Sequence, residues 1–196
     1  MEYLNSVDTQ LFLFLNGLHN DFFDSVMFWF SDKLFWSPLY LFIIFLIVKN
    51  YRMKGLLMLL FIGVVIALCD QTASHLLKNL VQRLRPSHEP SLANLIHLSK
   101  AGPGGLYGFV SSHAANSFGL ATFLYYALDS RFKPLKYFLF FWAAFVSYSR
   151  IYNGVHYPGD VIAGAFIGII YGYLLAKLFL SEKVNRLFIK KQQVNP

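Results

Sequence analysis

Long apolar segments separated by short polar connections dominate this sequence. Several apolar runs are only about 15 residues long, shorter than the roughly 20 residues that a helix needs to cross the hydrocarbon core of a bilayer. Polar turns must then complete these spans inside the protein, where backbone groups find hydrogen-bond partners. The pattern predicts an all-α, polytopic membrane bundle of about five transmembrane helices: Leu34–Val48, Gly55–Val81, Ser112–Leu128, Leu135–Tyr148 and Val161–Leu180. We expect the functional residues in the polar turns.

Two shorter segments precede the first of these spans. Leu11–Leu18 and Phe22–Phe30 carry apolar residues at helical spacing, interrupted by Asn and Asp residues. Helices of this kind lie in the membrane interface, so residues 1–33 are expected to form N-terminal interfacial helices. Residues 34–182 would then form the transmembrane domain, and residues 183–196 a basic cytoplasmic tail.

The basic residues predict how the bundle is oriented, because cytoplasmic loops are enriched in Lys and Arg. Two connections and the C-terminal tail fall on one side of the five predicted spans and carry basic clusters: Lys49, Arg52 and Lys54; Arg131, Lys133 and Lys136; and Lys183, Arg186, Lys190 and Lys191. The opposite side holds most of the acidic residues. We therefore expect the N-terminus outside and the C-terminus in the cytoplasm.

Composition supports the membrane assignment. Hydrophobic residues make up 56% and charged residues 14% of the 196 residues, which departs from soluble domains in the direction of membrane proteins. The net charge of +7 could suggest nucleic-acid binding, but that function needs a clustered basic face on a soluble body. Because Cys69 is the single cysteine, neither an intramolecular disulfide nor a cysteine metal site is expected.

Lys78 and Arg85 form the first of three polar clusters at the outer ends of the predicted spans. They are seven residues apart, nearly two helical turns, so both side chains should project from one helix face, with Pro86 ending the helix. Two cations aimed at one point suit a phosphate group. The alternative is that both snorkel to the membrane interface. Asp70 and Ser74 continue the four-residue spacing upstream, where they would form one polar stripe that holds Lys78 in place; the favoured interpretation is that they make structural contacts between helices.

The second cluster, Ser111-Ser112-His113, opens the third predicted span. Serines at a helix start usually act as N-caps. The free backbone N–H groups of a helix start also form an anion site, and a histidine can transfer a proton near neutral pH. Asn116 follows Ser112 by one turn, where it either lines the same cavity or bonds to a neighbouring helix.

Arg150, His156 and Asp160 form the third cluster. His156 and Asp160 are four residues apart, a spacing at which a carboxylate can hold one imidazole nitrogen and leave the other free to attack. A lone histidine is usually structural, but this one comes with an aspartate, an arginine and the turn Pro158-Gly159. The cluster therefore predicts a nucleophilic histidine.

Together the clusters have the order Lys-x6-Arg-Pro, Ser-x-His and Ser-Arg-x5-His-x3-Asp, which resembles the three-part signature of the type 2 phosphatidic acid phosphatase superfamily. The resemblance covers Lys78 to Asp160 and implies a membrane helical bundle with phosphatase activity. It implies that His156 is the nucleophile that forms a phosphohistidine and that Asp160 orients it. His113 would protonate the leaving oxygen.

The same resemblance implies a set of phosphate-binding residues: Lys78, Arg85, Ser111, Ser112 and Arg150. Their charges and donors would offset the charge that develops in the transition state. Two residues depart from the superfamily's Pro-Ser-Gly-His motif, because Val110 replaces proline and Ser112 replaces glycine. Activity is still expected, since the first serine and the histidine remain. Neither a metal ion nor another cofactor is implied, because the cations take the role of a divalent ion.

All three clusters fall on the outer side, so the expected substrate is a lipid phosphate or pyrophosphate reached from outside a bacterial inner membrane. Undecaprenyl pyrophosphate is the first choice, because the layout resembles small bacterial members that recycle this carrier. Phosphatidylglycerophosphate, phosphatidate and lipid A are alternatives, and an anion or lipid transporter is the alternative of a different class. The membrane setting argues against a vanadate haloperoxidase. No nucleic-acid partner is expected, and residues 86–110 are a candidate cap over the site.

Overall fold

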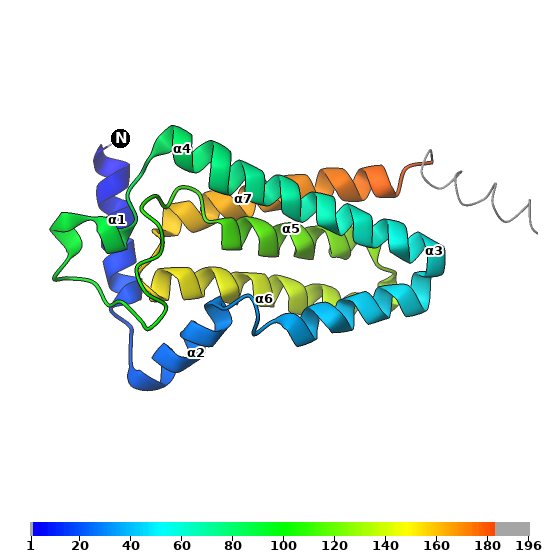
Figure 1. The fold of residues 1–196 in the computed structure, drawn as a ribbon, viewed down its shortest axis with the longest axis horizontal. Helices are drawn as coiled ribbons and strands as arrows, with labels where there is room; N and C mark the ends of the chain where they lie inside the picture. Colours follow the sequence, from blue (N-terminus) through cyan, green and yellow to red (C-terminus); the bar gives the residue numbers. More distant parts are fainter. Residues whose placement is uncertain (1, 183–196) are drawn as a thin grey trace, which may run out of the picture.

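The computed structural model describes residues 2–182, which form helices joined by short connections (Figure 1). The α-helices are α1 (Glu2–Asn16), α2 (Asp21–Ser31), α3 (Ser37–Asp70), α4 (Lys78–Val81), α5 (Ser112–Ala127), α6 (Lys133–Tyr152) and α7 (Pro158–Phe179). A π-helical segment, Gln71–Leu77, joins α3 to α4, and 3-10 turns cover Pro86–His88, Pro90–Leu92 and Ser130–Phe132. Residues 2–182 contain helices and no β-strand, so the all-α class is as predicted.

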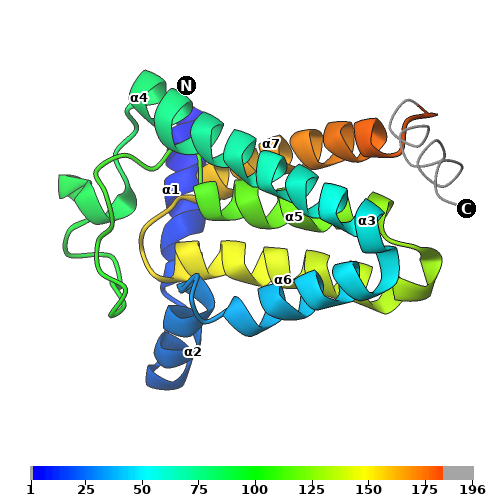
Figure 2. The same ribbon diagram turned by 45° about the vertical axis from the view of Figure 1, so that its right-hand side comes forward.

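Helix α3 doubles back on itself at Arg52. This residue has φ 49° and ψ −125°, a backbone conformation outside the helical region. Gly55 lies where the two arms approach each other, because a Cβ atom added to it would be 2.8 Å from the carbonyl oxygen of Ile47. Figure 2 shows the chain reversing its direction at this bend. The two arms match the first two predicted apolar segments.

Helices α5 and α7 pack closely because glycine recurs every four residues along α7. Cβ atoms added to Gly164, Gly168 and Gly172 would lie 2.4, 2.2 and 2.5 Å from carbonyl oxygens of α5 or its N-cap. Small residues at this spacing let two helix backbones approach in a membrane bundle. Since α5 begins at Ser112 and α7 begins at Pro158, this packing brings the second and third polar clusters together.

Replacing Gly168 with alanine should destabilise the protein by about 1–3 kcal/mol, because the added methyl group would overlap backbone atoms of α5 that cannot move aside. Thermal unfolding of the detergent-purified protein measures this effect. Gly63→Ala is the matched control, since nothing lies within 4 Å of a Cβ atom added there. An unchanged unfolding temperature for Gly168→Ala would show that the contact between α5 and α7 is looser than described.

The outer surface of the bundle is apolar. Large side chains such as Leu41 (66% exposed), Phe141 (65%) and Ile162 (67%) point away from the core, where bilayer lipid would cover them. Two helical segments, Ser37–Val81 and Pro158–Phe179, are long and apolar enough to cross a membrane. The first of them contains the bend at Arg52. A count of five transmembrane helices stays a prediction.

The two ends of the bundle differ in the kind of segment that they carry (Figure 1). The bend of α3 and the connection between α5 and α6, both basic, lie at one end, whereas α1, residues 82–111 and the connection between α6 and α7 lie at the other. This matches the predicted separation of basic loops from polar clusters. The predicted basic tail, residues 183–196, lies outside the described residues, and the orientation in a membrane stays a prediction.

Helices α1 and α2 belong to the end that carries the polar clusters. Helix α1 lies across this end of the bundle (Figure 1) and starts at Glu2, well before the predicted Leu11. Helix α2 begins after Asn20, whose side chain accepts a hydrogen bond from the backbone N–H of Phe23 (3.0 Å). Its last residue, Ser31, is buried. Both helices are present, α1 with other bounds than predicted, and their placement in the membrane interface stays a prediction.

Candidate active site

His156 lies in the short connection between α6 and α7 and is buried. Its Nδ1 atom is 3.3 Å from Oδ2 of Asp160, which lies in the first turn of α7. The backbone N–H of Tyr157 donates to the same carboxylate oxygen (3.1 Å), and Pro158 begins the helix with a preset φ. The predicted pair is therefore formed, with one imidazole nitrogen held by the carboxylate.

The charge state of His156 follows from its surroundings. Burial lowers the pKa of His156 well below its ordinary value of 6.5, and the positive charges of Arg85, Arg150 and Lys78 lower it further. The imidazole is therefore neutral near pH 7, the form whose free nitrogen can attack an electrophile. All three predicted phosphate-binding cations therefore act electrostatically on this histidine.

Lys78 and Arg85 reach this region by a route that differs from the prediction. The helix ends at Val81, because Gln82 adopts a left-handed conformation with φ 51° and ψ 30°. Arg85 instead lies on an extended segment whose backbone N–H donates to the carbonyl of Leu106 (3.0 Å). The prediction that both cations share one helix face is therefore wrong, since a left-handed residue redirects the chain between them.

The Arg85 side chain is held in place by backbone carbonyls. Its Nε donates to the carbonyl of Tyr107 (3.2 Å) and its Nη1 to that of Val155 (3.3 Å). A Cβ atom added to Gly104 would be 2.8 Å from Nη1 of Arg85. A side chain at this position in the connection between α4 and α5 would therefore displace the guanidinium. Part of the predicted cap, residues 86–110, thus shapes the site directly, whereas its closure over a substrate stays a prediction.

Upstream of Lys78, the predicted polar stripe is present in part. Ser74 donates a hydrogen bond to Asp70 (3.2 Å), and the negative charge of Asp70 acts on Lys78. The intervening residues are π-helical, which shifts the register that a four-residue spacing assumes.

Ser111 occupies the N-cap position of α5, but its side chain makes no capping hydrogen bond. Its Oγ is buried and has no partner among residues 2–182, so the capping interpretation is wrong for this side chain. Its backbone N–H donates to the carbonyl of Asp160 (3.0 Å). Ser112 follows as the first residue of α5. A free hydroxyl beside the N–H groups of a helix start suits an anion.

Arg150 and His113 both contact the end of α2. Nη1 of Arg150 donates to Oγ of Ser31, and the backbone of Ser31 forms a hydrogen bond with His113. Nε of Arg150 is buried without a partner in the described part of the chain, so this donor is available to a phosphoryl oxygen. Ser31 was not predicted from the sequence, because nothing in its local pattern connects α2 with the site.

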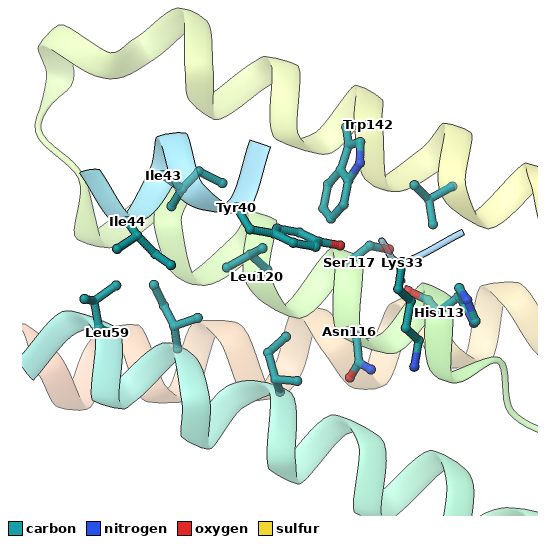
Figure 3. A pocket seen from close by; sticks show the side chains of 13 residues that line it. Lys33, Tyr40, Ile43, Ile44, Leu59, His113, Asn116, Ser117, Leu120 and Trp142 are labelled. Atoms are coloured by element: carbon teal, nitrogen blue, oxygen red, sulfur yellow. Dashed lines mark hydrogen bonds between the residues drawn. The ribbon is translucent and has the colours of Figure 1, made fainter. Parts of the chain in front are cut away.

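An apolar cavity of about 350 Å³ lies beside His113. Its walls come from both arms of α3, from α5 and from α6, and include Ile62, Leu120 and Trp142. Figure 3 shows Asn116 and Lys33 next to His113 at one end of the cavity. Asn116 therefore lines the cavity, as one of its two interpretations predicted. Lys33 was missed, since a single lysine between two helices carries no pattern.

Arg83 links Asp160 to a second carboxylate, that of Asp8. Arg83 donates to Oδ1 of Asp160 (3.0 Å) and also to Asp8 of α1 (2.7 Å). Neither Arg83 nor Asp8 was predicted as part of the site, although Arg83 stands inside the first motif. Within residues 2–182, no group of three or more His, Cys, Asp or Glu side chains is arranged to hold a metal ion.

This geometry is that of a phosphoryl-transfer enzyme built into an apolar helical bundle: a neutral, carboxylate-held histidine surrounded by cations. Residues 53–183 match the PAP2 superfamily. The chain belongs to this superfamily and is a membrane lipid phosphatase of the PAP2 type. The resemblance drawn from the three motifs is therefore confirmed.

Known proteins of the superfamily extend the similarity to most of the chain. Lipid A 4'-phosphatase of Bacteroides thetaiotaomicron is 42% identical over 187 residues, 94% of this chain and 81% of that protein. The crystal structure of Aquifex aeolicus LpxE is 27% identical, with a TM-score of 0.65, over 86% of this chain and 94% of that one. A transmembrane PAP2-type phosphatidylglycerolphosphate phosphatase from Bacillus subtilis shares the fold, with a TM-score of 0.66 and 23% identity, over 93% and 90% of the two chains.

Proposed function

We propose that this protein removes a phosphate monoester from lipid A or a closely similar phosphorylated glycolipid, through a phosphohistidine at His156. The observation that carries the proposal is the neutral His156, held by Asp160 and surrounded by three cations. The choice of lipid is supported by the 42% identity to a protein named lipid A 4'-phosphatase. Undecaprenyl pyrophosphate, the first choice from sequence, gains no such support from these relatives.

The proposed reaction has two steps. In the first, Nε2 of His156 attacks phosphorus, an N–P bond forms, and the P–O bond to the lipid breaks. His113 gives its proton to the leaving oxygen, and Lys78, Arg85 and Arg150 stabilise the charge on the transferred group. In the second step, water attacks the phosphohistidine, His113 takes a proton from that water, and inorganic phosphate leaves as the N–P bond breaks.

The cavity supports a lipid substrate rather than a soluble one. His113, the proposed acid, lines an apolar space of about 350 Å³, and an acyl chain placed there would lie next to the leaving oxygen. Lys33 and Asn116 lie at the same end of the cavity (Figure 3) and offer a cation and an amide to the polar part of the lipid. The proposed head group therefore lies at the start of α5 and the chain between α3, α5 and α6.

Replacing Ile62 with tryptophan should raise KM for a long-chain lipid phosphate more than about tenfold, because the larger ring occupies space that the chain needs. Hydrolysis of p-nitrophenyl phosphate, which has no chain, should change little. Steady-state kinetics on both substrates measures the contrast. Ile162→Trp is the matched control, since Ile162 is 67% exposed on the outer face of α7 and does not line the cavity. Equal losses on both substrates would place the lipid chain elsewhere.

Phosphate release by the detergent-purified protein tests the substrate. Lipid A, undecaprenyl pyrophosphate, phosphatidylglycerophosphate and phosphatidate are compared in excess chelator, with His156→Ala as control. The proposal expects lipid A to give the highest kcat/KM and release to resist the chelator. Faster hydrolysis of another lipid would overturn the choice of substrate while keeping the enzyme class. Transport of an anion or lipid by a variant that cannot hydrolyse would favour the transporter alternative.

A further inference from the structure

Asp160 has two carboxylate oxygens with different partners. Its Oδ2 faces Nδ1 of His156 (3.3 Å) and accepts the backbone N–H of Tyr157 (3.1 Å). Its Oδ1 accepts a hydrogen bond from Nη1 of Arg83 (3.0 Å). Because the Asp160 side chain is 0% exposed, its charge depends on such partners rather than on water.

Arg83 is itself held from two sides. Its Nη2 donates to Oδ2 of Asp8 (2.7 Å), and its guanidinium lies 4.0 Å from the ring centroid of Tyr157. The side chains of Arg83 and Asp8 are 21% and 16% exposed, so the pair is partly screened from water. A planar guanidinium that bridges two carboxylates and stacks on an aromatic ring has little freedom to move.

Asp8 reaches this position because the neighbouring backbone leaves room for it. Its Oδ1 accepts the backbone N–H of Gly159 (2.8 Å), and a Cβ atom on Gly159 would lie 2.7 Å from its Oδ2. Gly108 likewise leaves room for the Asp160 carboxylate, since a Cβ atom added to Gly108 would be 2.8 Å from Oδ2 of Asp160. Glycines therefore make room for both carboxylates in the series of contacts that runs from Asp8 through Arg83 and Asp160 to His156.

We infer that Arg83 and Asp8 are positioning residues for the proposed nucleophile. Asp8 orients Arg83, and Arg83 keeps Asp160 ionised and correctly oriented. Asp160 in turn holds His156. The inference rests on the proposed function. Arg83 and Asp8 form side-chain hydrogen bonds with each other, with Asp160 and with Gly159, so each residue acts on His156 through its neighbour. Partners that orient a catalytic or ligating group typically change activity about 10–100-fold when removed.

Kinetics of Arg83→Gln, Asp8→Asn and the double variant test this chain of contacts. Arg83→Gln should lower kcat by about 10–100-fold with KM changed little, since the orientation of the nucleophile is lost and substrate contacts remain. Asp8→Asn should have a smaller effect of the same kind. The double variant should be no slower than Arg83→Gln alone, because Asp8 acts only through Arg83. Arg83→Lys, which keeps a cation, should recover part of kcat.

The measurement uses steady-state release of p-nitrophenol from p-nitrophenyl phosphate, which gives kcat and KM, with the unfolding temperature of every variant recorded. Arg131→Gln is the matched control, because its ion pair with Asp129 is exposed and lies at the opposite end of the bundle. Multiplicative losses in the double variant, a rise in KM with kcat intact, or a lower unfolding temperature with normal kcat would each overturn the inference. Wild-type protein without phosphatase activity would instead contradict the proposed function.

Discussion

His156→Ala should abolish phosphate release, with an expected loss of at least about 10³-fold in kcat on every substrate. The imidazole forms the covalent bond to phosphorus in the proposed reaction, so no other described side chain can take its place in the first step. The loss should be the same for lipid A and for p-nitrophenyl phosphate. Phosphate release measured over long incubations, with protein purified in parallel, checks it.

A correctly folded variant is needed for this result to bear on mechanism. His156 is buried beside Asp160, so His156→Gln, which keeps a polar side chain of similar length, is the companion variant. Both variants should unfold near the wild-type temperature. Residual activity above about one tenth of the wild type in either folded variant would be inconsistent with a nucleophilic role.

His113→Ala should produce the second largest effect, a loss of about 10²–10⁴-fold in kcat on lipid substrates. The leaving group of a glycolipid phosphate is an alkoxide, which needs a proton as the P–O bond breaks. His113 is the second residue of α5 and lines the cavity, where it can reach that oxygen. Phosphate release from lipid A measures the loss.

The leaving group separates the role of His113 from that of His156. p-Nitrophenolate leaves without a proton, so the first-turnover release of p-nitrophenol by His113→Ala should remain within about tenfold of the wild type. His156→Ala should show no such release. Leu120→Ala, two turns further along the same cavity wall, is the control for packing. Equal loss of first-turnover release in His113→Ala and His156→Ala would contradict the proposed proton transfer.

The sequence predicted those parts of the site that depend on local spacing. His156 and Asp160 meet because four residues across a helix start place them together, whatever the rest of the chain does. Lys78 and Arg85 meet for a reason that their spacing does not contain, since the chain turns at Gln82 in a left-handed conformation. The spacing of the motif therefore predicted correctly that Lys78 and Arg85 act at the same site. It predicted wrongly that one continuous helix carries both residues.

Contacts between distant segments could not be read from the pattern. Asp8 lies 75 residues from Arg83 and 151 from Gly159, and the cavity beside His113 has walls from α3, α5 and α6. Each segment shows only an ordinary apolar or polar run on its own. The glycines of α7, spaced four apart, are the one sequence signal that could have predicted the close approach of α5.

The measurement that tests the proposed mechanism most directly is identification of the phosphorylated residue during turnover. Wild-type protein is mixed with lipid A carrying ³²P in its phosphate, quenched within one turnover at alkaline pH and digested for mass spectrometry. The mechanism predicts phosphate on His156, absent in His156→Ala and turned over when unlabelled substrate follows. Steady release of phosphate with no phosphohistidine, or with label on another residue, would contradict it.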